Sequence, residues 1–150
     1  MAEECRASGD QRYELALSDF AAYLGKLQER RAEVQPAGRV PSDEYWLEDS
    51  GSILGGVRLR FRLTPELEFE GGHVGYDVRP SMRRRGHGTC LLQLALPILR
   101  QHGIRQVRIT CDDDNIGSAK IIEKNGGRLS GQGISPESGK MVRQYWIELA

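Results

Sequence analysis

The chain has 150 residues, of which 28% are charged, and its 21 lysines and arginines balance its 21 aspartates and glutamates. This length is enough for one domain with a hydrophobic core. The zero net charge excludes a protein whose overall electric field draws it to nucleic acid or to an anionic membrane.

Targeting and redox signals are sparse. No apolar run is long enough to span a bilayer, and the acidic N-terminus lacks the apolar core of a signal peptide. Cys5, Cys90 and Cys111 are odd in number and widely spaced, which favours buried thiols in a reduced protein over a disulfide framework. Without Cys-x-x-Cys or His-x-x-x-His spacing, no metal is expected. We therefore expect a cytoplasmic protein without a membrane anchor.

The first periodic segment predicts one long helix. Leu17, Phe20 and Leu24 recur at helical spacing between roughly Asp10 and Val34, with charged residues among them. Pro36 and Gly38 end the pattern. Residues 1–40 are therefore expected to form an N-terminal helical part of a single domain that spans residues 1–150.

Two strands are predicted next. The aromatic segment 44–48 is short, whereas residues 52–63 alternate apolar side chains with Arg58, Arg60 and Arg62. Such alternation is typical of a strand with one wet face, so these arginines are interpreted as solvated.

The middle of the chain predicts a connection, a strand and a helix. Pro65 breaks the preceding strand, and the acidic residues 66–70 follow it as a loop. A strand is predicted over residues 73–79 and a largely apolar helix over residues 88–102.

The last third predicts a strand, a short helix and a hairpin. The strand covers residues 106–111, and Asn115 can cap a helix over residues 116–125. The hairpin pairs residues 128–134 with residues 141–149. The order of helix, three strands, helix, strand, helix and two strands predicts a mixed α/β (α+β) domain with its core in residues 41–150.

The loop between the strand 73–79 and the helix 88–102 predicts a phosphate site. It reads Arg83-Arg84-Arg85-Gly86-His87-Gly88-Thr89. Backbone N–H groups in the first turn of a helix lack internal partners and attract anions, and glycines let a phosphate approach the backbone. A plain turn is the alternative. Contact with RNA or DNA is disfavoured because no aromatic residues interleave with the arginines, and a P-loop because no Gly-Lys-Ser/Thr ending follows.

The order of motifs around this loop is similar to that of the GCN5-related N-acetyltransferases, the GNAT superfamily. Arg83 to Gly88 match Arg-x-x-Gly-x-Gly, with Val78-Arg-Pro80 before them and Asn115-Ile-Gly-Ser118-Ala119 and Glu123-Lys-Asn-Gly-Gly127 after them. The chain further resembles a subgroup of poorly characterised predicted acetyltransferases in Gly72-His73-Val74-Gly75-Tyr76, Thr110-Cys-Asp-Asp-Asp-Asn115 and Tyr145-Trp-Ile147. The resemblance covers roughly residues 45–149.

The resemblance implies a mostly antiparallel central sheet with one splayed parallel strand pair and flanking helices. The family fold usually begins with a strand, and residues 1–9 contain no convincing strand, so that strand is expected to be missing or the chain to begin late.

The implied activity is transfer of an acetyl group from acetyl-CoA to a primary amine of a small molecule or peptide by direct attack. Tyr76, Asp77 and Val78 match the strand that holds the pantetheine arm, and a backbone N–H near Val78 would face the thioester carbonyl. The implied cofactor contacts beyond that strand are Arg83, Arg84, Arg85, Gly86, His87, Gly88, Thr89, Asn115 and Ser118.

Proton transfer has several candidates. His73 is the first candidate for a base and Asp77 the second, with Glu70 acting through water as a third. A histidine that ties two strands together and a solvated aspartate are the alternatives. The family's usual acid, a tyrosine in the late helix, is replaced by Ile122, which leaves Tyr145 as a substitute acid.

The missing tyrosine motivates a second hypothesis, a non-catalytic acyl-CoA-binding or interaction module. The acidic segments 66–70 and 112–114 would suit a cationic acceptor, although solvated loops have the same composition. Exposed strand edges would favour a homodimer.

Overall fold

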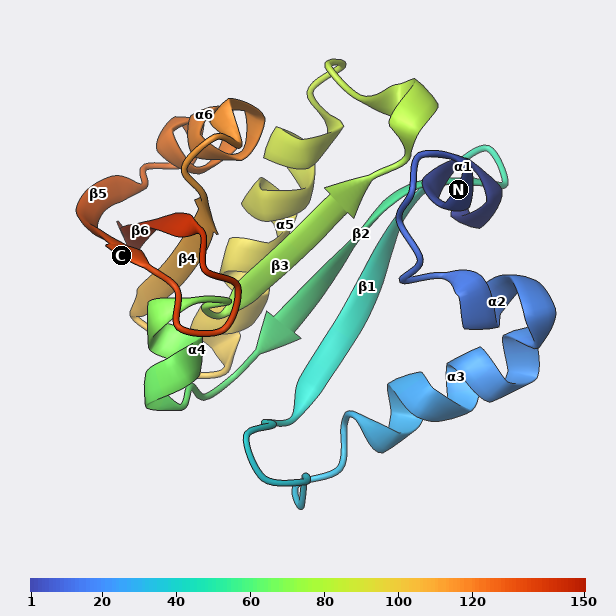
Figure 1. Cartoon of the computed structure of the whole chain (residues 1–150), viewed down its shortest axis with the longest axis horizontal. Helices are drawn as coiled ribbons and strands as arrows, with labels where there is room; N and C mark the ends of the chain where they lie inside the picture. Colours follow the sequence, from blue (N-terminus) through green and yellow to red (C-terminus); the bar gives the residue numbers. More distant parts are fainter.

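The computed structural model describes all residues from Met1 to Ala150 and contains two three-stranded antiparallel sheets flanked by helices (Figure 1). The helices are α1 (Ala2–Ala7), α2 (Glu14–Ser18), α3 (Phe20–Glu29), α4 (Pro65–Phe69), the 3-10 turn η1 (Pro80–Met82), α5 (His87–Gln101) and α6 (Ile116–Lys124). The strands are β1 (Ser42–Asp49), β2 (Ser52–Arg60), β3 (Val74–Val78), β4 (Gln106–Asp112), β5 (Arg128–Ile134) and β6 (Met141–Glu148).

All six predicted strands and the two later helices are confirmed, but the N-terminal helix is not. The helix predicted over residues 10–34 is wrong as one element, because Asp19 adopts an extended backbone (φ −152°, ψ 93°) between α2 and α3. Its carboxylate accepts a 2.9 Å hydrogen bond from the Ala22 N–H and so caps α3. The loop predicted at residues 66–70 is also wrong, since Thr64 caps the short helix α4 and Pro65 occupies its first turn.

The two sheets meet where β3 and β4 begin. The strand orders are β1-β2-β3 and β4-β6-β5. The crossover helix α5 links β3 to β4, and these strands run in the same direction (Figure 1). The His73 N–H donates to the Arg108 carbonyl at 2.8 Å, but no ladder continues between β3 and β4. This is the splayed parallel pair that the resemblance implied. No strand precedes β1 in the described chain.

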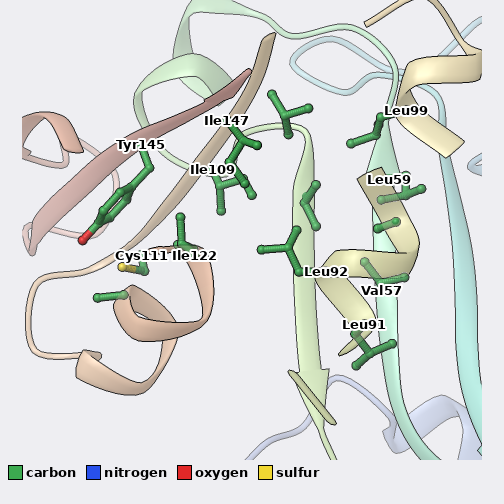
Figure 2. Packing of buried hydrophobic residues seen from close by; sticks show 14 residues of the cluster. Val57, Leu59, Leu91, Leu92, Leu99, Ile109, Cys111, Ile122, Tyr145 and Ile147 are labelled. Carbon is green, nitrogen blue, oxygen red and sulfur yellow. The ribbon is translucent and has the colours of Figure 1, made fainter. Parts of the chain in front are cut away.

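One hydrophobic core joins the sheets. Leu91, Leu92 and Leu99 of α5 are almost fully buried against Val57 and Leu59 of β2. Figure 2 shows this packing together with the side chains that the second sheet and α6 contribute, Ile109, Cys111, Ile122, Tyr145 and Ile147. Each fully buried leucine contributes about 2 kcal/mol, so α5 fixes the position of the loop that precedes it.

The N-terminal helices lie beside the opposite face of β1 and β2 (Figure 1). The Tyr23 ring stacks on Trp46 at 6.5 Å between centroids. Glu4 of α1 accepts hydrogen bonds from Arg79 (2.6 Å) and from the Ser81 N–H (2.9 Å), which anchors α1 to η1. None of the helices has both the length and the apolar character needed to cross a bilayer.

Candidate active site

The loop before α5 presents a run of free backbone N–H groups. The N–H groups from Arg84 to Thr89 donate to no other group of the protein, and the first bond of α5 runs from the Cys90 N–H to the Gly86 carbonyl at 3.0 Å. Gly86 caps the helix with φ 87°, and Arg84 also has a positive φ of 62°. The free N–H groups and the helix dipole together form a cradle for an anion.

This cradle opens into a cavity of about 840 Å³, here called the loop cleft. Its walls come from β3, from the loop and from the first turns of α6. Arg85 is exposed and does not line the loop cleft. Every other cofactor residue predicted from the sequence does: Tyr76, Asp77, Val78, Arg83, Arg84, Gly86, His87, Gly88, Thr89, Asn115 and Ser118.

The rim of the loop cleft is basic. Arg83, Arg84, Lys120 and Lys124 line it, and none of these four side chains pairs with a carboxylate. Sequence reasoning missed both lysines. Their spacing of four residues on a helix capped by Asn115 was the available signal, because it puts them on the same face of α6.

The β4-facing edge of β3 carries free backbone groups beside this cleft. The Arg60 N–H donates to the His73 carbonyl and the Arg79 N–H donates to the Leu54 carbonyl, each at 2.8 Å. Because neighbouring strand residues point to opposite edges, Tyr76 and Val78 direct their backbone groups into the gap between β3 and β4. The Val78 carbonyl accepts a 3.2 Å hydrogen bond from Arg83 Nε. The edge is therefore open to an extended ligand arm.

Tyr76 stands between the loop cleft and a second cavity of about 310 Å³, the splay cavity, which lies between β3 and β4. Its hydroxyl lies 2.7 Å from Ser118 Oγ, and Ser118 is held by the Asn115 cap through a 3.0 Å hydrogen bond from its N–H. Burial raises the pKa of Tyr76 to about 12. The phenol is therefore protonated and positioned by α6.

A third cavity of about 170 Å³, the sheet-face cavity, lies on the side of β3 that faces the N-terminal helices. Tyr13, Glu44, Arg58 and Asp77 are among its lining residues. Gly75 lines both this cavity and the splay cavity, so the two cavities meet at β3.

Asp77 lies between the sheet-face cavity and the loop cleft. Its carboxylate accepts hydrogen bonds of 2.7 and 2.9 Å from the Tyr13 hydroxyl, and Arg12 approaches it at 3.7 Å. Burial raises the pKa of Asp77, while the Tyr13 hydrogen bond opposes that rise. A carboxylate with a raised pKa at the meeting point of two cavities is suited to accept a proton.

His73 has a different environment. Its side chain is buried, and Nδ1 accepts a 2.9 Å hydrogen bond from the Arg108 N–H. Burial lowers the pKa of His73, so the ring is neutral near pH 7. It lines none of the three cavities. Its contacts are those of a side chain that ties β3 to β4.

Tyr145 and Ile122 both belong to the hydrophobic core. Tyr145 is 1% exposed, and its hydroxyl donates a long 3.4 Å hydrogen bond to Glu123. Ile122 is fully buried. Neither residue lines the three cavities. Tyr76 is therefore the tyrosine that lines the loop cleft.

The thiol of Cys111 lines the splay cavity, and burial raises its pKa, so it is a poor nucleophile at neutral pH. Cys5 is also buried, and all three cysteines are free. No group of three or more His, Cys, Asp or Glu side chains has the arrangement of a metal site.

The fold of the chain has counterparts in solved structures. RimL, a ribosomal L7/L12 alpha-N-protein acetyltransferase in complex with coenzyme A, superposes with a TM-score of 0.59 at 21% identity over 72% of this chain and 62% of its own. The putative acetyltransferase yncA from Salmonella typhimurium, solved with acetyl-CoA, superposes with a TM-score of 0.62 at 14% identity over 100% of this chain and 91% of its own.

The aminoglycoside acetyltransferase AAC(6')-Ib, in complex with coenzyme A, superposes with a TM-score of 0.60 at 14% identity over 71% of this chain and 66% of its own. The chain thus spans less than two thirds of the RimL chain. At these identities the superpositions show a shared fold.

No curated protein matches the sequence. The family model of the acetyltransferase (GNAT) family matches residues 9–127, which include the loop, β3, β4 and α6. The chain therefore belongs to the GNAT family of acetyltransferases.

Proposed function

We propose that this protein is an N-acetyltransferase that moves an acetyl group from acetyl-CoA to a primary amine of a small molecule or peptide by direct attack. The observation that carries the proposal is the run of free N–H groups from Arg84 to Thr89, which opens into a cleft that continues to the unpaired edge of β3. This combination suits a ligand with a pyrophosphate at one end and an extended amide-containing arm at the other.

The residues present fit coenzyme A. The free N–H groups would hold the pyrophosphate, and Arg83, Arg84, Lys120 and Lys124 offer unpaired cations to the remaining phosphate. The edge groups of Tyr76 and Val78 would pair with the amides of the pantetheine arm. The arm would thereby reach the point where the loop cleft and the splay cavity meet, beside the Tyr76 hydroxyl.

When bound, acetyl-CoA supplies the acetyl group: the amine nitrogen bonds to the acetyl carbon as the carbon–sulfur bond breaks, the amine loses a proton and the sulfur gains one. We assign the acid to Tyr76, because it is protonated, is held by Ser118 and faces the loop cleft. Tyr76 would take the role of the late-helix tyrosine that the family usually carries where this chain has Ile122. The Val78 N–H would stabilise negative charge on the thioester oxygen.

We assign the base to Asp77. It faces both the loop cleft and the sheet-face cavity, where an acceptor could lie, and its ionised form is held by Tyr13 and Arg12. His73 stays a prediction as a base, with less geometric support because Nδ1 is occupied by the Arg108 N–H. Two of the superposed proteins support an amine acceptor, since RimL is an alpha-N-protein acetyltransferase and AAC(6')-Ib is an aminoglycoside acetyltransferase.

The alternative is a non-catalytic acyl-CoA-binding module, which the isoleucine at position 122 favours. Calorimetric titration with CoA should show binding in both cases. Release of free thiol from acetyl-CoA across a broad amine panel, with acetylated product identified by mass spectrometry, is expected only of the enzyme. CoA binding without any acetylated amine would support the module, and absence of CoA binding would contradict both.

A further inference from the structure

Four arginines, Arg12, Arg30, Arg58 and Arg60, line the sheet-face cavity, and two of them share one carboxylate. Arg30 lies 3.6 Å and Arg58 lies 3.5 Å from the same oxygen of Glu44, Oε2. Arg60 lines the cavity as well and forms no ion pair. The other carboxylate of the cavity, Asp77, is engaged by Tyr13 and Arg12. The cavity therefore holds more half-buried positive charge than its own acids balance.

The donors of two of these arginines are incompletely used. Arg58 Nε is buried and has no hydrogen-bond partner. Arg60 donates through Nη1 to the Gly72 carbonyl at 3.0 Å, and burial together with Arg58 and Arg30 lowers the pKa of Arg60 to about 10. An unsatisfied buried donor is unfavourable, and a guanidinium without a counter-ion is more so. An anion in the cavity would relieve both.

Gly75 provides the space for that anion and connects it to the reaction centre. Strand pairing puts Gly75 opposite Arg58, and a Cβ at Gly75 would meet no atom within 4 Å. The same glycine lines the splay cavity, into which the Tyr76 side chain also faces. A molecule above Gly75 can therefore touch the arginines with one end and reach the gap between β3 and β4 with the other.

Resting on the proposed acetyl transfer, we propose that the acceptor is a small amino acid-like molecule with a carboxylate besides its amine, and that Arg58 and Arg60 bind the carboxylate. A guanidinium fork matches the two oxygens of a carboxylate. The cavity, at about 170 Å³, is smaller than the roughly 300–1,000 Å³ of sites for drug-sized ligands. It suits a free amino acid better than a folded protein terminus. The amine would lie above Gly75, near Asp77.

The test uses matched acceptor pairs, in which each standard amino acid is compared with its C-terminal amide. With acetyl-CoA and the wild-type protein, kcat/KM for the preferred amino acid should exceed that for its amide by about tenfold or more, as expected for a charge-assisted contact. Arg58→Met and Arg60→Met should bring this ratio close to one. Arg62→Met is the matched control, because Arg62 follows on the same segment but pairs with Glu33 outside the three cavities.

A purely structural role for the arginines would lower turnover of acid and amide alike and leave the ratio unchanged, and this outcome would overturn the proposal. Equal use of acids and amides by the wild type would do the same. If no amine is acetylated at all, the proposed function fails separately, and calorimetry with the CoA-loaded protein then decides. Binding of the amino acid but not the amide, lost in both variants and kept in Arg62→Met, would support the carboxylate site; no carboxylate-dependent binding would refute it.

Discussion

The Arg108 N–H donates a 2.9 Å hydrogen bond to Nδ1 of His73, so a side chain takes the place of a backbone acceptor at the point where β3 and β4 separate. The His73 N–H returns a bond to the Arg108 carbonyl. These paired contacts close one end of the gap between the strands. Beyond them the edge groups of Tyr76 and the Val78 N–H stay free, while the Val78 carbonyl accepts a hydrogen bond from Arg83 Nε.

Replacing His73 should therefore lower the stability of the protein more than it lowers turnover. His73→Ala leaves the Arg108 N–H without its acceptor and should lower the free energy of unfolding by about 1–3 kcal/mol. His73→Asn offers an amide oxygen in a similar position and should lose less. Denaturant unfolding of the three proteins measures this difference. Equal stability of the alanine variant and the wild type would contradict the structural role.

The same histidine predicts a pH dependence. Burial lowers the pKa of His73, so the folded protein binds a proton at this residue less readily than the unfolded chain, in which the histidine pKa is about 6.5. Stability should therefore fall as the pH falls below about 6.5. His73→Asn, which cannot titrate, should show a shallower loss between pH 7.5 and 5.5. Parallel curves for the two proteins would refute the assignment.

Gly86 and Gly103 form a matched pair at the two ends of α5. Both have a positive φ, 87° and 82°, and a Cβ at either would meet no atom within 4 Å. Valine at either position should cost about 1–2 kcal/mol of stability through backbone strain. Only Gly86→Val puts a side chain over the free N–H groups, so only this variant should lose CoA affinity, by about 100-fold, or about 3 kcal/mol. Calorimetry with CoA checks both variants, and unchanged affinity in a folded Gly86→Val protein would contradict the phosphate loop.

The loop could be predicted from sequence because its signals are local. Gly86, Gly88 and the arginines stand together, and the chemistry of a helix N-terminus follows from that order. The break at Asp19 could not, because apolar residues recur at helical spacing on both sides of it and only the extended backbone and the bond to Ala22 separate α2 from α3.

Contacts between distant segments also lie beyond the reach of the sequence pattern. The bond between Tyr13 and Asp77 joins residues 64 positions apart. The sequence pattern indicates that Arg58 and Arg60 lie on the wet face of a strand, yet residues of the N-terminal helical part line a cavity on that face and leave both arginines half-buried. The alternation of β2 was predicted correctly, whereas its polar face is less open to water than the pattern indicated.

Tyr76→Phe tests the proposed acid. The variant keeps the ring but removes the hydroxyl, so kcat should fall by about 100-fold, the lower end of acid catalysis, with CoA affinity changed by less than about threefold. Tyr145→Phe is the control, since that hydroxyl lies in the core and lines no cavity. A loss of turnover in Tyr145→Phe with full turnover in Tyr76→Phe would reverse the assignment.

Asp77 predicts the acid limb of the pH–rate profile. Burial raises the pKa of Asp77 above its ordinary value of 3.8, and a base must be ionised, so kcat/KM should fall as the pH falls through that raised value. Tyr13→Phe removes a hydrogen bond that lowers this pKa and should move the limb to higher pH. Asp77→Asn should lower turnover by about 100-fold. A limb that stays in place in Tyr13→Phe would argue against Asp77 as the base.

A crystal structure of the protein with CoA tests the central claim most directly. The pyrophosphate should lie within about 3.2 Å of backbone nitrogens between Arg84 and Thr89, and the pantetheine amides should pair with the β3 edge at Tyr76 and Val78, with the sulfur near the Tyr76 hydroxyl. Phosphates bound away from this loop, or an arm that leaves the gap between β3 and β4 empty, would contradict it.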